Sequence, residues 1–163
     1  MKKSKFLLVA ITSSLISSAQ SADFNEEFKK DLKSTRSSVS TGIDFNEKDQ
    51  SNIYKESISN LHIQSKADIG VSGLKGLILN NYEPAILTLA SLYKLGELID
   101  QDLDKSIILY KKLPKNPDAL ISLGAIYHSQ GEFDEASKYY NLAKEAGHPF
   151  AQRNIEQLKL DSE

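Results

Sequence analysis

Three histidines, His62, His128 and His148, are the side chains best able to bind a metal or move a proton near neutral pH. They are far apart, and no carboxylate or cysteine stands near them at the spacing of a metal-ligand set. We therefore expect surface or capping histidines, and no metal or other cofactor is predicted. The chain has no cysteine, which excludes disulfides, thiolate metal sites and a cysteine nucleophile.

A serine hydrolase is the other chemistry to consider, with Ser72 as its nucleophile. The surrounding sequence GVSGLKG, residues 70–76, has neither the Gly-x-Ser-x-Gly elbow nor the glycine–lysine order of a phosphate-binding loop. The acidic residues within 132–135 mark a helix start, where the helix dipole favours negative charge. No catalytic residue is assigned, and a hydrolase site at residues 70–76 is the weakest functional hypothesis.

The first 22 residues have the form of a secretory signal peptide. Lysines at the start are followed by an apolar run from Phe6 to Ile16 and by small residues ending at Ala22. The apolar run is shorter than the about 20 residues that cross a bilayer. Cleavage after Ala19 or Ala22 is expected, with export to the periplasm or secretion from a bacterium and no stable membrane insertion afterwards.

Removal of residues 1–22 leaves 17 basic and 22 acidic side chains, a formal net charge of -5. A mildly acidic surface does not favour nucleic acid or anionic membranes as partners. Residues 23–48 are polar, with Phe24, Phe28 and Leu32 four residues apart. This spacing indicates a short amphipathic helix, while the composition is also typical of disorder, and both interpretations stay open.

Helical periodicity begins near residue 49, so residues 49–163 are interpreted as one helical domain. Prolines 84, 117 and 149 mark first turns of helices, and Gly147 marks a helix end with left-handed backbone. No alternating strand pattern is present, so an all-α fold is predicted. The expected helices lie near residues 49–63, 67–80, 83–95, 103–113, 117–129, 133–146 and 149–160.

The chain matches itself after a shift of 34 residues, which places Ala90 on Gly124 and Tyr93 on Tyr127. Such a period is typical of stacked helix pairs. Small residues let two helices approach closely, and large aromatic residues fill the space beside them. We therefore expect Gly124 to face Ala136, with Tyr127 and Tyr140 packed around the pair.

The residue types and spacing around Leu123, Gly124, Tyr127, Ala136 and Tyr140 resemble the tetratricopeptide (TPR) signature. The preceding unit is similar to the Sel-one-like variety, which has a longer loop between paired helices. Sixteen positions separate Ala90 from Ser106, against twelve between Gly124 and Ala136. Three residues depart from the family pattern: Leu98 replaces a glycine, Ser106 replaces an alanine and Leu109 replaces a tryptophan.

The resemblance implies an α-solenoid of antiparallel helix pairs, with about 2.5–3 repeats. It also implies which residues pack between helices, namely Ala90, Tyr93, Gly96, Tyr110, Leu123, Gly124, Tyr127, Ala136, Tyr140 and Ala143. The first helix of each pair would line a partner-binding groove. The groove positions are Leu87, Ser91, Lys94, Ile121, Ala125, His128, Arg153 and Gln157, although packing against a neighbouring helix is an equal alternative for them.

These groove positions are mostly apolar or small, which argues against a clamp for a C-terminal carboxylate. The resulting functional hypothesis is a non-catalytic scaffold or adaptor that binds a protein or peptide in the bacterial envelope. The runner-up is a dedicated regulator or inhibitor of one envelope enzyme, or a secreted factor for interaction with a host.

Overall fold

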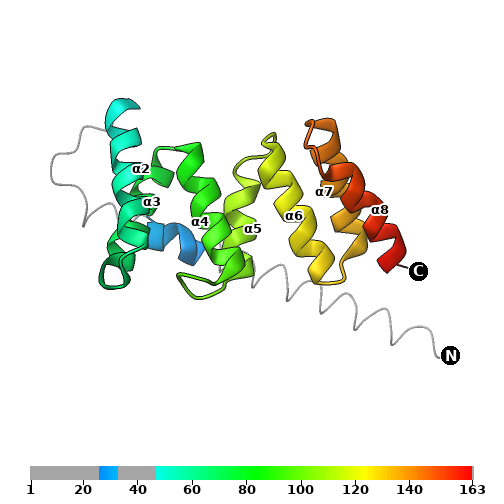
Figure 1. Cartoon of the computed structure of the whole chain (residues 1–163), viewed down its shortest axis with the longest axis horizontal. Helices are drawn as coiled ribbons and strands as arrows, with labels where there is room; N and C mark the ends of the chain where they lie inside the picture. Colours follow the sequence, from blue (N-terminus) through cyan, green and yellow to red (C-terminus); the bar gives the residue numbers. More distant parts are fainter. Residues whose placement is uncertain (1–25, 33–46, 163) are drawn as a thin grey trace.

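The computed structural model describes residues 26–32 and 47–162, and all regular structure within these ranges is helical (Figure 1). Residues 26–32 form a short helix. The elements after it are α2 (Glu47–Leu61), the 3-10 turn η1 (Gln64–Lys66), α3 (Ala67–Leu79), α4 (Glu83–Leu95), α5 (Leu103–Lys111), α6 (Pro117–Ser129), α7 (Phe133–Glu145) and α8 (Ala151–Asp161). The predicted all-α class is confirmed, and each predicted helix is present to within two residues at its ends.

Consecutive helices form the hairpins α2–α3, α4–α5 and α6–α7, and α8 packs against α7. The hairpins stand side by side in one row, because α3 contacts α4 and α5 contacts α6 (Figure 1). This arrangement is the predicted α-solenoid with a TPR-like fold. It contains three helix pairs and one closing helix among the described residues.

Two contacts tie the first helix of one pair to the first helix of the next. The hydroxyls of Tyr54 on α2 and Thr88 on α4 lie 2.8 Å apart. The Asn116 amide, at the start of α6, donates to the carboxylate of Glu83 on α4. These contacts hold α2, α4 and α6 along one side of the stack, where the groove residues are expected.

The helix boundaries follow from local chemistry. The side chain of Asn116 accepts a hydrogen bond from the Ala119 amide at 2.9 Å and caps α6. Gly147 has φ of 82°, so its predicted left-handed conformation after α7 is confirmed. Pro149 was expected to begin the last helix but lies in the turn before α8. Gly96 is exposed with φ of 71°, so it ends α4 and does not pack between helices.

A glycine, Gly124, lies where α6 crosses α7. Gly124 is buried, and a Cβ atom added to it would overlap the ring of Tyr140. The expected packing of Tyr140 beside Gly124 is therefore present. Ala136, which was expected to face Gly124, is fully buried in the same cluster as Tyr140.

The other two hairpins cross at small residues as well. In α4–α5 the hydroxyl of Ser106 donates to the carbonyl of Ala90 at 2.8 Å, and neither residue is exposed. In α2–α3 a Cβ atom at Gly73 would overlap the hydroxyl of Ser57. Ser57 and Gly73 are sixteen positions apart, as are Ala90 and Ser106. The first hairpin therefore follows the geometry of the second.

Gly124→Ala is expected to lower the free energy of unfolding by about 1–3 kcal/mol, because the added Cβ displaces the buried Tyr140 ring. Gly76→Ala on α3 is the matched control, since nothing lies within 4 Å of its added Cβ. That control should raise stability by up to about 1 kcal/mol through helix propensity. Urea unfolding followed by circular dichroism measures both. Equal stability of the two variants would contradict the close crossing.

Candidate functional site

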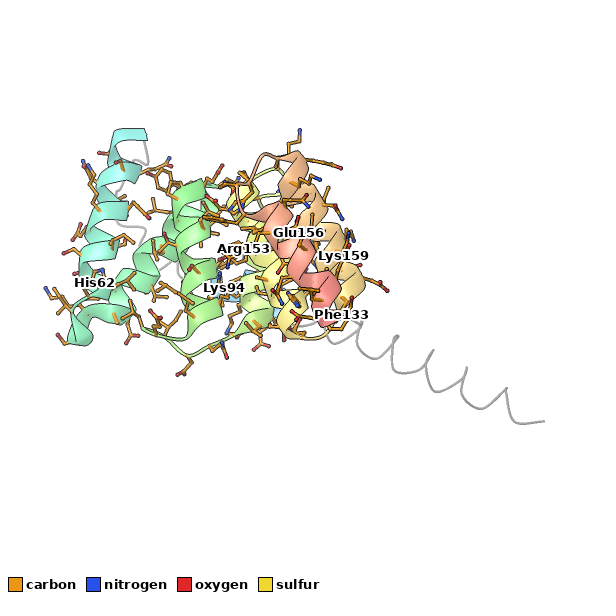
Figure 2. All side chains as sticks on the ribbon, turned by 45° about the vertical axis from the view of Figure 1, so that its right-hand side comes forward. His62, Lys94, Phe133, Arg153, Glu156 and Lys159 are labelled. Carbon is orange, nitrogen blue, oxygen red and sulfur yellow. The ribbon has the colours of Figure 1, made fainter. Side chains whose placement is uncertain are left out.

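The eight predicted groove residues lie on α4, α6 and α8, and none of them is fully buried. Ala125, Arg153 and Gln157 are exposed, while the other five are half-buried. Figure 2 shows Arg153 on the edge of α8 nearer to α4, and Lys159 on the opposite edge. The predicted positions are thus accessible in varying degree, and the structure brings four of them, Ser91, Lys94, His128 and Gln157, into two local clusters.

The first cluster surrounds Tyr110 of α5, which is buried. Its phenol interacts with the side chains of Ser122 of α6 and Ser91 of α4. The Lys94 ammonium lies 6.0 Å from the centre of the Tyr110 ring. Burial raises the pKa of Tyr110 and lowers the pKa of Lys94. Two predicted groove residues, Ser91 and Lys94, therefore meet around a side chain that was predicted to pack between helices.

The second cluster surrounds His128 at the end of α6. Its Nε2 atom lies 3.0 Å from a carboxylate oxygen of Asp161, and its Nδ1 atom lies 3.4 Å from the Tyr140 hydroxyl. The Gln157 amide donates to the other oxygen of Asp161 at 2.9 Å. Asp161 on α8 therefore connects two predicted groove residues. The sequence analysis missed it, although its position one helical turn after Gln157 is a usable signal.

Two other groove positions take part in packing. Leu87 packs against the main core cluster, and Ile121 packs against both clusters at the C-terminal end. The packing alternative therefore applies in part to these two residues. Leu160 was not predicted, yet it is 69% exposed on α8. When the last helix is aligned with α6 so that Ala151 matches Ala119, Leu160 corresponds to the predicted groove residue His128.

Metal binding, membrane spanning and the hydrolase hypothesis at residues 70–76 were each compared with the described residues. Within residues 26–32 and 47–162 no group of three or more histidine and acidic side chains could hold a metal ion. No helix in the same ranges combines the length and apolar character needed to cross a bilayer. Gly70 and Gly73, which flank Ser72, lie against Ser57 of α2 and serve helix packing.

The fold and these clusters define a class of protein, an α-solenoid of TPR-like helix pairs with accessible side chains on its first helices. No protein-family model matches the chain. A stretch of 63 residues, 39% of the chain, is 36% identical to anaphase-promoting complex subunit 6 of Dictyostelium discoideum. The match spans 7% of that protein. This similarity and the helical architecture fit a TPR-like repeat protein.

His128→Ala is expected to lower the free energy of unfolding by about 1–2 kcal/mol, because it removes contacts that connect α6 to α7 and α8. Amide hydrogen exchange should accelerate across α8 more than across α2 and α3. His62→Ala is the matched control, since His62 is exposed at the far end of the stack (Figure 2). Unchanged exchange in α8 would show that these contacts do not hold the last helix.

Stability is expected to fall above about pH 10. Burial raises the pKa of the Tyr93, Tyr110 and Tyr140 phenols, so above that pH the folded chain retains protons that the unfolded chain loses. Their contribution is complete below the unfolded pKa and is lost as pH rises through the folded values. Tyr110→Phe should reduce the slope of unfolding free energy against pH in this range. An unchanged slope in urea titrations would contradict the assignment to Tyr110.

Proposed function

We propose that the chain is a non-catalytic protein–protein interaction module, a TPR-like scaffold or adaptor. The observation that supports this proposal is the repetition of accessible side chains along α4, α6 and α8, next to helix faces that are buried. A row of parallel first helices suits an extended or helical segment of a partner. The similarity of one stretch to a protein named as a subunit of a complex agrees with such a role.

The side chains along this surface suggest which segments it binds. Exposed Ala125 lies in the middle of the row, on α6, and offers a small apolar contact. Lys94 on α4 and Arg153 on α8 add positive charge toward either side. A partner segment with apolar residues in its centre and acidic residues near its ends complements this distribution.

The finer assignment also belongs to the proposal. The sixteen-residue spacing of the crossing residues in two successive hairpins supports the Sel-one-like variety of repeat. The basic, apolar and small-residue order of residues 1–22 supports export to the periplasm or secretion from a bacterium. The formal charge of -5 after residue 22 favours protein partners over nucleic acid. A regulator of one envelope enzyme and a host-directed factor would use the same surface, and the captured partner distinguishes them.

A photo-crosslinking amino acid at position 125 is expected to capture a partner in the envelope fraction of the bacterium that encodes the chain. The same group at Lys144, which is exposed on the second helix α7, is the matched control and should capture none. Mass spectrometry identifies the products. Equal capture at both positions would refute the assignment of the surface to the first helices.

With the crosslinking amino acid placed at exposed Arg153 on α8 instead, Ala125→Glu is expected to reduce capture at least about tenfold, because a charged side chain in the middle of the surface must be desolvated by the partner. Its stability should change by less than about 0.5 kcal/mol, since Ala125 is exposed. Ile121 and His128 are poorer test positions, since their contacts inside the stack make any substitution a stability change as well. Undiminished capture by a stable Ala125→Glu variant would contradict the proposal.

A further inference from the structure

The turns that join paired helices differ in length and in the side chains that they expose. The α6–α7 turn consists of residues 130–132, all polar or glycine, whereas the α2–α3 and α4–α5 turns span residues 62–66 and 96–102. Four large apolar side chains in or near the two longer turns are exposed, namely Ile63 (42%), Ile69 (58%), Leu95 (52%) and Leu98 (43%). Because three residues close the α6–α7 hairpin, helix pairing alone does not require these longer turns.

The four apolar side chains lie at one edge of the stack, and we call them the turn surface. Both longer turns lie along this edge in Figure 1, and their hairpins are neighbours because α3 contacts α4. Seven large apolar side chains are exposed among the described residues, and four of them belong to the turn surface. Such a concentration of exposed apolar side chains on a folded protein is typical of an interaction site.

The α4–α5 turn is held in a defined conformation. The Asp102 amide donates to the Tyr93 carbonyl at 2.9 Å, and the Gln101 side chain donates to the Lys94 carbonyl at 2.9 Å. Ile99 packs against the main core cluster. Compact surface loops with their ends held close together are frequently functional. A partner that binds the two leucines would not have to order this turn, which lowers the entropy cost of binding.

Negative charge surrounds the turn surface. Residues 62–69 and 95–105 contain two basic and five acidic side chains, a formal net charge of -3. Four of the acidic side chains are exposed, namely Asp68, Glu97, Asp100 and Asp104. The fifth, Asp102, pairs with Lys105 at 2.8 Å. The apolar side chains therefore lie among carboxylates that attract lysine or arginine.

This charge distinguishes between the possible occupants of the turn surface. Carboxylates repel an anionic lipid surface. A second copy of the chain that met the first through the same surface would bring two negative surfaces together. A protein segment with both basic and apolar residues complements the carboxylates and also covers the leucine and isoleucine side chains.

We propose that the turn surface is a docking surface for a basic segment of a partner protein that also carries apolar residues. This inference rests on the proposed function, because it presumes a protein partner. It concerns the turns at the end of the first two hairpins, whereas the first surface runs along α4, α6 and α8. The two can therefore fail independently.

A fluorescent peptide of leucine and lysine, patterned as an amphipathic helix, serves as the probe, and anisotropy measures its binding to the full chain. A Leu95→Ser/Leu98→Ser variant should bind it at least about tenfold more weakly, because apolar contact area is lost. A Leu142→Ser/Phe150→Ser variant is the matched control, since it removes two exposed apolar side chains elsewhere on the stack. Its affinity should be unchanged. Equal affinity of all three chains, or no binding, would overturn the proposal.

Reversal of two charges tests the surface without changing its apolar residues. The unaltered chain should prefer the lysine peptide at least about tenfold over one in which glutamate replaces lysine. A Glu97→Lys/Asp100→Lys variant should show the opposite preference. Both residues are exposed, so this variant should keep its melting temperature. The same preference in both chains would refute the choice of a basic partner.

A photo-crosslinking amino acid at position 98 tests the natural occupant in the envelope fraction. Mass spectrometry of the product identifies the partner segment that is attached, and this segment should carry a net positive charge. Attachment to a segment with net negative charge would overturn the proposal.

The other occupants give different outcomes. Concentration-dependent dimers in sedimentation that the Leu95→Ser/Leu98→Ser variant does not form would assign the surface to a second copy. Binding to phosphatidylcholine vesicles that the same variant loses would assign it to lipid. Either result would overturn the choice of a protein partner. Crosslinks from position 125 provide the separation from the proposed function, because their persistence while peptide binding fails would refute the turn surface alone.

Discussion

The close approach of paired helices at very small residues is the constraint on which this structure depends. Each hairpin has such a crossing, formed by Ser57 and Gly73, by Ala90 and Ser106, and by Gly124 with the Tyr140 ring. Helices that touch at these residues leave little space between them, so the larger side chains fill the sides of the crossing. Repetition of this contact aligns the first helices and leaves one of their faces accessible.

The sequence predicted most of the architecture because both of its signals can be seen along the chain. Prolines at first turns and the period of 34 residues define helices and their pairing without knowledge of the third dimension. Which of the two expected neighbours of Gly124 touches it directly could not be predicted in the same way. Periodicity shows which face of α7 turns inward, but the choice between Ala136 and Tyr140 depends on how far the ring reaches across the crossing. The α2–α3 pair has a weak repeat signal, and only its Ser57–Gly73 contact reveals the shared geometry.

The candidate surfaces were less predictable because their contacts join elements outside the repeat pattern. Repeat positions place Ser91 and His128 on first helices, but they do not show that Tyr110 and Asp161 lie beside these side chains. The spacing of Phe28 and Leu32 indicates a helix but does not show which helices it packs against. The packing of Phe28 against Tyr93 becomes visible only in three dimensions.

Ser106 has a consequence beyond helix packing. Its hydroxyl lies in a fully buried position and is satisfied by one carbonyl of α4, that of Ala90. Sliding α5 by one turn along α4 would break this hydrogen bond, at a cost of about 0.5–1.5 kcal/mol. An alanine would pack there without this penalty and would tolerate the slip. The serine thus favours one register of α5 against α4 over registers shifted by a turn. Its role is to specify the alignment of the two helices more than to add to the free energy of unfolding.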